Sequence, residues 1–243
     1  MAYLSGFHAI EERIKAAEPG QTGPLLVAKA GPRARKIVDL AAERKIRVNR
    51  VGTHELDRLV PDHRGIALYT DDRETGNEVT LAGFLAGLGD RKDALAVILD
   101  EITDPHNYGA ILRSCDQFGA DLVVTRHRRI AKHAEIVSKT SAGADSWVPV
   151  AETANLFRAA ESLKEAGFWI YGADMAGDAV WSKDLRGRTA IILGGEGTGL
   201  SRLLREQCDA LVSIPAQGRV DSLNVSVAAG VLLYEISRQR GQG

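Results

Sequence analysis

The fold is decided by residues 95–114, whose sequence is LAVILDEITDPHNYGAILRS. The apolar run Leu95–Leu99 predicts a buried strand. An Asp-Pro turn follows, and a helix is expected to begin near Tyr108, which places Asn107 either as a helix cap or as a side chain in a cleft. This order of strand, polar turn and helix is typical of α/β proteins, in which ligands bind at the carboxyl ends of the strands.

The same rhythm continues from about residue 80 to the C-terminus. Helix Leu156–Ala166 is well marked, because Asn155 can cap its start and Gly167 can end it in the left-handed conformation. The other strand-like runs are Leu122–Thr125, Trp147–Val150, Phe168–Gly172, Ile191–Leu193 and Leu211–Ile214. Alternating strands and helices predict an α/β fold with a mainly parallel sheet and helices on both faces.

The first seventy residues predict a separate, small α/β unit. The polar stretch Thr70–Glu78 has no apolar periodicity and predicts an extended connection. We therefore expect a first domain at 1–70, a linker at 71–92 and a second domain at 93–243. The elements expected in the first domain are a helix at Ala9–Ala17, an extended run at Leu25–Lys29, a helix at Ala34–Arg44 preceded by Pro32, and strands at Val48–Val51 and Ile66–Tyr69.

Composition excludes several classes of protein. The chain has 243 residues, of which 44% are hydrophobic, and none of its apolar runs approaches the roughly 20 residues of a membrane span. The N-terminus does not resemble an export signal, and Cys115 and Cys208 have no ligand or redox spacing, so we expect a cytoplasmic protein with reduced thiols and no membrane partner. We also expect no metal, because the six histidines show no ligand spacing.

Positive charge is concentrated in two places on a chain whose net charge is −1. Residues 1–50 contain ten basic and five acidic residues. A second cluster combines Arg126, Arg128, Arg129, Lys132 and Lys139 with a single acid, Glu135. Either cluster alone is explained by a solvated surface, but the two together make a phosphate-binding surface plausible.

Two further polar segments follow predicted strands. Residues 193–200 (LGGEGTGL) form a glycine-rich loop that lets backbone amides approach a ligand closely. The spacing G-G-x-G-x-G differs from the dinucleotide fingerprint, which disfavours a nucleotide-dependent oxidoreductase. Residues 214–228 (IPAQGRVDSLNVSVA) precede an apolar helix at Val225–Ile236, for which Ser222 or Asn224 is the expected cap.

Together the three segments resemble the signature motifs of the SpoU/TrmH family of RNA ribose methyltransferases, in the same order. The N-terminal part also resembles the recognition domain of the RlmB branch of that family, through residues 6–10 (GFHAI) and 63–66 (HRGI). That domain is similar to small ribosomal RNA-binding proteins. Arg64 stands where Gln is expected and Cys115 where Ala is usual, which affects target choice and packing more than catalysis.

The resemblance implies S-adenosylmethionine as cofactor, a deep trefoil knot near the C-terminus and a homodimer packed through the knotted domains. It implies methylation of a ribose 2′-hydroxyl in RNA, with a guanosine of 23S ribosomal RNA favoured over transfer RNA. The positions that match catalytic residues are Asn107, Arg113, Glu196, Ser222 and Asn224. The positions that match cofactor-binding residues are Leu193, Gly194, Gly195, Ile214, Ser222 and Leu223.

The role of Arg113 is open to physical argument. Family proposals make this arginine activate the hydroxyl, yet a guanidinium stays protonated at any ordinary pH. We expect Arg113 to orient the ribose and an adjacent phosphate, and Glu196 to hold Arg113 or neighbouring backbone. A transfer RNA 2′-O-methyltransferase is the first alternative. An RNA-binding or ribosome-assembly protein without activity is a less favoured one, because the polar residues of all three motifs are intact.

Overall fold

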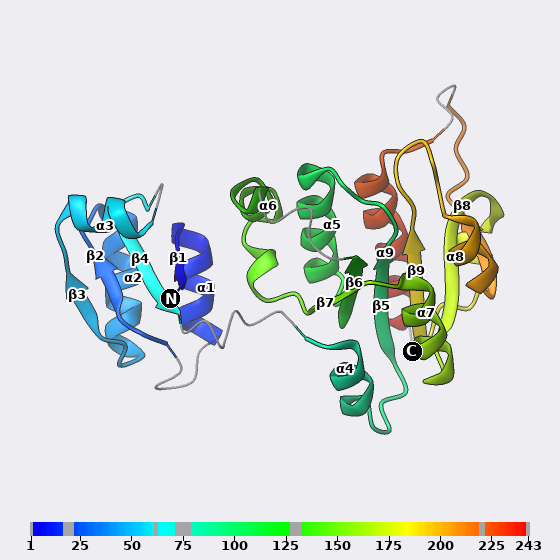
Figure 1. The fold of residues 1–243 in the computed structure, drawn as a ribbon, viewed down its shortest axis with the longest axis horizontal. Coiled ribbons are helices and arrows are strands. Elements are labelled where there is room, and N and C mark those ends of the chain that lie inside the picture. Colours follow the sequence, from blue (N-terminus) through cyan, green and yellow to red (C-terminus); the bar gives the residue numbers. More distant parts are fainter. Residues whose placement is uncertain are drawn as a thin grey trace. The chain divides into compact units, whose positions relative to one another are not determined.

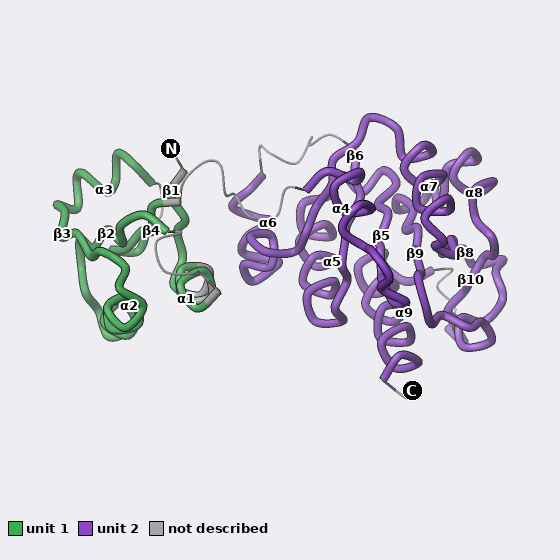
Figure 2. Tube along the Cα trace, turned by 90° about the horizontal axis from the view of Figure 1, so that it is seen from below, with its two compact units in different colours: residues 1–76 green, residues 77–243 purple. Residues whose placement is uncertain are grey.

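The computed structural model describes residues 2–16, 22–60, 63–70, 79–126, 133–218 and 222–241. The chain divides into two compact units, residues 1–76 and residues 77–243 (Figure 2). Part of the expected linker (71–78) and three members of the second basic cluster (Arg128, Arg129 and Lys132) lie outside the described residues. None of the helices in the described ranges is long and apolar enough to cross a membrane.

The first unit is a four-stranded sheet in the order β1-β4-β2-β3. Strands β2 and β3 are parallel, whereas β4 is antiparallel to β1 and β2. One face of the sheet packs on α1 and α2, and the other packs on α3. The elements are β1 (Ala2–Leu4), α1 (Phe7–Ala16), β2 (Leu25–Val27), α2 (Pro32–Glu43), β3 (Val48–Arg50), α3 (Thr53–Leu59) and β4 (Ile66–Thr70). The short β1 and α3 were not expected from the sequence.

The second unit is a six-stranded sheet in the order β10-β8-β9-β5-β6-β7, in which every strand pair is parallel (Figure 1). The strands are β5 (Ala94–Leu99), β6 (Leu122–Arg126), β7 (Val150–Thr153), β8 (Trp169–Ala179), β9 (Arg188–Leu193) and β10 (Ala210–Ser213). Strands β6 and β7 lie on one side of β5, and strands β9, β8 and β10 lie on the other. Parallel sheets bind ligands where the strand order reverses in this way. Here that point is the carboxyl edge between β5 and β9.

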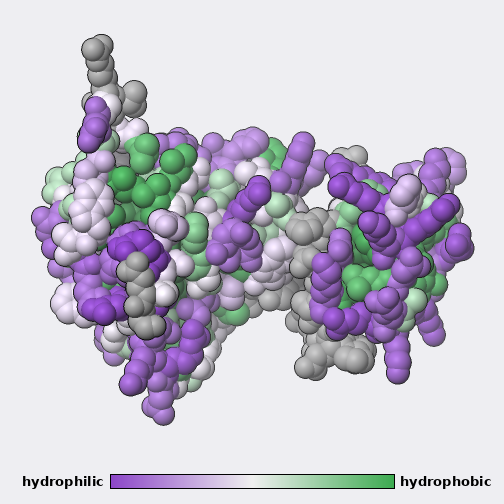
Figure 3. All heavy atoms as spheres, turned by 180° about the vertical axis from the view of Figure 1, so that it is seen from behind, coloured by the Kyte–Doolittle hydropathy of each residue, from purple (hydrophilic) through white to green (hydrophobic). Residues whose placement is uncertain are grey.

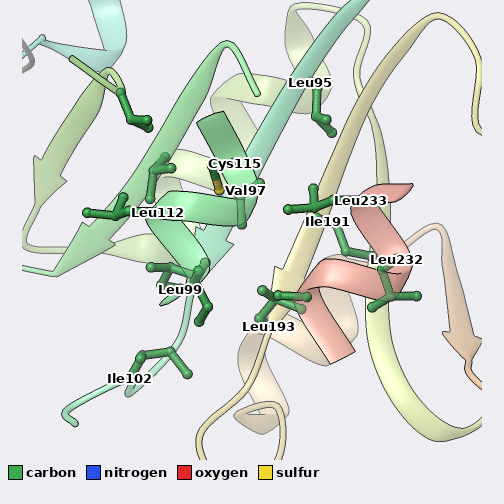
Figure 4. Close-up of a cluster of buried hydrophobic side chains, with 14 of the residues drawn as sticks. Leu95, Val97, Leu99, Ile102, Leu112, Cys115, Ile191, Leu193, Leu232 and Leu233 are labelled. Atoms are coloured by element: carbon green, nitrogen blue, oxygen red, sulfur yellow. The ribbon is translucent and has the colours of Figure 1, made fainter. Parts of the chain in front are cut away.

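Helices cover both faces of this sheet, so the predicted mainly parallel α/β fold is confirmed. Alternate residues of β5 face opposite sides, because strand side chains alternate. Leu95, Val97 and Leu99 pack with α5 and α9, as Figure 4 shows. The opposite face packs on α4, α7 and α8. The helices are α4 (Leu81–Gly87), α5 (Pro105–Gln117), α6 (Ala134–Ser141), α7 (Leu156–Glu165), α8 (Arg202–Gln207) and α9 (Val225–Arg240), with 3₁₀ turns η3 (Ala144–Ser146) and η4 (Val180–Ser182).

Both cysteines are free thiols. Cys115 lies within the α5–α9 face of the core, and its burial raises the pKa of the thiol to about 12. Burial, the main cause, also raises the pKa of Cys208 to about 11. Both groups therefore stay protonated at neutral pH, so they serve as packing residues.

The predicted boundaries of α7 are confirmed by its hydrogen bonds. The Asn155 side chain accepts a bond of 3.2 Å from the Arg158 amide. Beyond the last turn, Gly167 takes a φ of +83°. The amides of Gly167 and Phe168 bond back to the carbonyls of Lys164 and Leu163, which is the Schellman arrangement.

Two elements of the second unit differ from expectation. The strand expected at Trp147–Val150 begins only at Val150, because η3 precedes it and the Trp147 indole donates to Asp116 at 2.6 Å. Within the expected linker, residues 81–87 form α4, which packs through Leu81, Phe84 and Leu85 on the second core.

Candidate functional site

The first motif of the site opens helix α5. Asp104, and not Asn107, is the cap, since its carboxylate accepts from the His106 amide at 2.8 Å. The helix therefore begins at Pro105, three residues earlier than the expected start at Tyr108. The Asn107 side chain is buried in the first turn, so of the two roles expected for it, the inward-pointing one is observed.

The glycine-rich loop follows β9 and folds back on itself. The Gly199 amide donates to the Gly195 carbonyl at 2.9 Å. A Cβ at Gly194 would lie 2.2 Å from the carbonyl carbon of Gly199, so only glycine allows this approach of two backbone segments. The Ser201 amide then donates to Asp100 at 2.8 Å, which ties the loop to the end of β5.

The third motif opens helix α9. Asn224, one of the two expected caps, accepts through its side-chain oxygen from the amides of Ser226 and Val227 at 2.9 and 3.3 Å. Residues 219–221 lie outside the described residues, so the full path from β10 to this cap is not described. Because these bonds hold Asn224 Oδ1 toward the start of α9, Asn224 Nδ2 points away from the helix.

The three motifs meet in one hydrogen-bonded cluster. Glu196 Oε1 accepts from Asn224 Nδ2 at 2.6 Å and from Asn107 Nδ2 at 3.1 Å. The Asn224 Nδ2 group also donates to Asn107 Oδ1 at 3.0 Å. Residues separated by up to 117 positions thus converge at the carboxyl edge between β5 and β9. Charge-assisted bonds of this kind to a carboxylate are stronger than bonds between neutral groups.

Arg113 lies apart from this cluster. It follows Asn107 by six residues, and a helix turns by about 100° per residue, so the two side chains leave α5 on different faces. The Arg113 side chain is exposed and has no hydrogen-bond or ion-pair partner within the described part of the chain. Glu196 was expected to hold Arg113 or neighbouring backbone; in this structure its carboxylate bonds to the two asparagines and not to Arg113.

A cavity of about 590 Å³ lies beside the cluster. Three of the residues expected to be catalytic line it: Glu196, Ser222 and Asn224. All six positions expected to bind cofactor line it as well, namely Leu193, Gly194, Gly195, Ile214, Ser222 and Leu223. These residues belong to separate motifs in the sequence, and the fold brings them to one place.

One wall of the cavity was missed in the sequence. Ala173, Asp174 and Met175 line it from an excursion of β8. This excursion is held against β10, since a Cβ at Gly177 would lie 2.5 Å from the Val212 amide nitrogen. Asp174 also forms an ion pair with Arg205. The polar and glycine residues that follow the predicted strand Phe168–Gly172 are the signal that would have identified this wall.

The cavity fits S-adenosylmethionine in size and lining. Its volume lies within the range of about 300–1,000 Å³ found for small-molecule sites. Residues 194–199 of the glycine loop line it together with Ser213, Ile214 and Ala216, while Val212, Ala228 and Leu232 give it an apolar side. Among the described residues, no group of His, Cys, Asp and Glu is arranged to hold a metal ion.

Two family models match the chain. Residues 94–234 match the SpoU rRNA Methylase family, and residues 3–75 match the model described as RNA 2′-O ribose methyltransferase substrate binding. The first match alone spans more than half of the chain, and it contains all three motifs of the polar cluster.

Curated relatives and solved structures agree with these models. The 23S rRNA (guanosine-2′-O-)-methyltransferase RlmB of Xanthomonas campestris pv. campestris is 44% identical over 86% of this chain and 84% of its own. RlmB of Neisseria meningitidis serogroup B is 39% identical over 98% of this chain and 95% of its own. The SpoU methyltransferase AviRb from Streptomyces viridochromogenes, solved in complex with the cofactor AdoMet, superposes with a TM-score of 0.74 at 24% identity, covering 99% of this chain and 91% of its own. The chain therefore belongs to the SpoU rRNA methylase family.

Proposed function

We propose that this protein transfers a methyl group from S-adenosylmethionine to the ribose 2′-hydroxyl of a guanosine in 23S ribosomal RNA. The observation that carries the proposal is the convergence of all six expected cofactor positions on one cavity beside the Asn107–Glu196–Asn224 cluster. The substrate rests on the relatives named 23S rRNA (guanosine-2′-O-)-methyltransferases, which match over most of this chain.

The cofactor supplies a methyl group activated by attachment to a positively charged sulfur. The task of the protein is then alignment, for which positioning can contribute about 7–11 kcal/mol. Backbone groups at 194–199 and 213–216 hold the ligand. The apolar side formed by Val212, Ala228 and Leu232 excludes water from it.

The polar residues divide the remaining work. Asn224 and Asn107 are positioned by Glu196, which accepts a hydrogen bond from each amide. Asn224 therefore joins the start of α9 to the glycine loop and to α5. Arg113, exposed and unpaired within the described chain, binds a phosphate beside the target ribose and orients its hydroxyl. A guanidinium stays protonated, so Arg113 does not take the hydroxyl proton. The oxygen–methyl bond forms as the sulfur–methyl bond breaks, S-adenosylhomocysteine leaves as a neutral thioether, and the hydroxyl proton is lost late to solvent.

We assign RNA recognition to residues 1–70, the connection to residues 71–92, and cofactor binding with methyl transfer to residues 93–243. The match of residues 3–75 to a substrate-binding model supports the first assignment. Helix α4 lies in the connection by sequence but packs on the core of the larger unit.

The working form of the protein is a homodimer joined through the larger unit. Helix α9 leaves Val227, Val231 and Tyr234 exposed by 52%, 39% and 56%, and their spacing places them on one stripe. Hydrophobic side chains gather on that unit in Figure 3. Exposed apolar patches of this kind mark interaction sites. Sedimentation analysis should find a dimer that Val231→Arg converts to a monomer; a wild-type monomer would contradict the assignment.

The loops around the cavity form a trefoil knot in this proposal. Support comes from the cavity itself, because residues 193–199 line it together with residues 212–214, Ala216 and residues 222–225, although α8 separates the two sets along the chain. Helix α9 then leaves the cavity and ends at Arg240, whose guanidinium donates to the carbonyls of Ala94 and Gly187 at 2.9 and 2.7 Å.

The test is methyl incorporation from labelled S-adenosylmethionine. The substrates are 23S ribosomal RNA and total transfer RNA from cells that lack this gene, and the modified positions are mapped by their resistance to alkaline cleavage. We expect one new 2′-O-methylguanosine in 23S ribosomal RNA. Methylation of transfer RNA alone would replace the substrate, and no methylation of either RNA by cofactor-binding protein would support a non-catalytic role.

A further inference from the structure

The first unit contains a second cavity, of about 360 Å³, between α2 and the parallel strands β2 and β3. Its floor consists of Val27, Ala30, Val38 and Val48. Charged residues on its rim are Arg35, Asp39 and Arg50. An apolar floor with a few polar groups at its edge is the usual form of a site for a small planar ligand.

The rim charges are available to a ligand. Asp39 and Arg50 are exposed and make no hydrogen bond or ion pair within the described ranges of the chain. The Nε of Arg35 donates to the Ala30 carbonyl at 3.2 Å and so fixes the guanidinium at the rim. Its two terminal nitrogens have no partner among the described residues and can bind phosphate or stack on a base.

The positive charges on the surface of the first unit suit a polyanionic ligand such as RNA. From Lys29 to Arg64, the lysines and arginines form no ion pair with any described residue. In the second unit, Arg91, Lys164 and Arg238 each pair with an acid, although Arg113 does not pair with any described residue. Unpaired cations on one unit favour phosphate contacts there.

Asp39 limits which base the cavity can bind. It lies one turn after Arg35 on α2, so both side chains reach the same rim. An ionised carboxylate only accepts hydrogen bonds, through two oxygens side by side. Among the four RNA bases, only guanine presents two adjacent donors, its ring N–H and its amino group, on the Watson–Crick edge.

We propose that this cavity holds one unpaired guanine of the RNA substrate. The base lies on the valine floor, Asp39 accepts from its Watson–Crick edge, and Arg35 and Arg50 bind the flanking phosphates. In this proposal the bound guanine and the methylated nucleotide are different nucleotides of the RNA, one held by each unit. The inference rests on the proposed RNA substrate and adds a specificity-determining site to it.

The test uses the full-length protein and fluorescent uridine hexamers with one central guanine, inosine, adenine or uridine. Inosine lacks only the amino group of guanine, so it isolates one of the two contacts. We expect the guanine hexamer to bind about tenfold more tightly than the adenine and uridine hexamers, as one bidentate base contact provides, and the inosine hexamer to bind with intermediate affinity.

Substitutions then test which residues cause the preference for guanine. Asp39→Asn keeps the shape of the exposed side chain but offers one donor in place of an acceptor, and it should abolish the preference for guanine. Glu43→Gln removes the same charge one turn further along α2, outside the cavity, and should keep the preference. Arg50→Gln should weaken all four hexamers alike, whereas Arg44→Gln should change them less.

Equal binding of the guanine, inosine and adenine hexamers would overturn the inference, and so would a preference that survives Asp39→Asn. Binding that depends on Arg50 but not on the base would show a phosphate site only. Methylation of 23S ribosomal RNA is measured on the same preparations. Active enzyme without base preference refutes the cavity alone, whereas inactive enzyme with base preference refutes the catalytic proposal alone.

Discussion

Single residues in this site do structural and chemical work at once. Asn224 caps α9 with its side-chain oxygen and bonds to Glu196 and Asn107 with its nitrogen. A side chain with one acceptor and one donor end is therefore needed, which explains why the capping interpretation of Asn224 and the catalytic one are compatible. Gly194 is similar, because the approach it permits is between two strands of the loop that line the cavity.

Arg113→Ala should lower the rate of methyl transfer by at least about 100-fold, since misplacement of the reacting groups costs this much. The affinity for S-adenosylmethionine should stay within about twofold, because Arg113 does not line the cavity. Calorimetry and a methylation assay measure the two effects. Arg158→Ala, at an exposed helical arginine paired with Glu161, is the control and should leave both unchanged. Near-normal turnover of Arg113→Ala would contradict its role.

Gly194→Ala should weaken S-adenosylmethionine binding by at least about tenfold, because the added Cβ forces the loop open against Gly199. Calorimetry gives the dissociation constant, and thermal unfolding shows whether the variant stays folded. Gly87→Ala is the matched control, since nothing lies within 4 Å of a Cβ there. An unchanged dissociation constant in folded Gly194→Ala would show that the loop does not shape the site.

At the scale of elements, the sequence predicted those that carry their own signals. The run Leu95–Leu99 lies within the observed β5, and α7 has both a capping asparagine and a terminal glycine. The sequence did not predict elements whose formation or boundaries depend on tertiary contacts. Helix α4 has seven residues, two of them glycine, and depends on packing against the second core. The late start of β7 depends on η3 and on the Trp147–Asp116 bond.

The cap of α7 gives a prediction at this scale. Asn155→Ala should lower the free energy of unfolding by about 0.5–2 kcal/mol, because the Arg158 amide loses its acceptor. Chemical denaturation measures this change at constant m-value. Cofactor affinity should not change, since Asn155 does not line the cavity. Asn155→Asp, which keeps an acceptor, should recover most of the loss; equal losses for both variants would show that the cap is not the cause.

For the whole molecule, the sequence predicts that the motifs follow strand ends, but it does not predict which of their side chains contact one another. The Glu196 bonds to Asn107 and Asn224 join residues 89 and 28 positions apart, and no local pattern carries that information. The cavity likewise depends on the β8 excursion, whose register shift against β10 is a tertiary feature. The division of the chain into two units rests instead on composition, which changes at the polar stretch near residue 70.

That division predicts separable functions. Removal of residues 1–76 should leave a folded protein that binds S-adenosylmethionine normally but methylates its RNA poorly. The cavity and polar cluster lie wholly within the second unit, whereas the unpaired cations from Lys29 to Arg64 are lost. Calorimetry with the cofactor and methylation of 23S ribosomal RNA measure the two properties. Removal of residues 1–92 is the informative comparison, because it also deletes α4 and exposes part of the second core, so this protein should be less stable.

Salt dependence of RNA binding separates recognition from mere loss of stability. Each phosphate contact contributes about −0.7 to the slope of log affinity against log salt concentration for single strands. If the cations of the first unit bind phosphates, the full-length protein must show a steeper slope than the protein that lacks residues 1–76. A merely destabilised protein would bind more weakly with an unchanged slope. Equal slopes together with equal methylation rates would show that RNA recognition lies in the second unit, where Arg113, Arg126 and Lys139 would be the next residues to substitute.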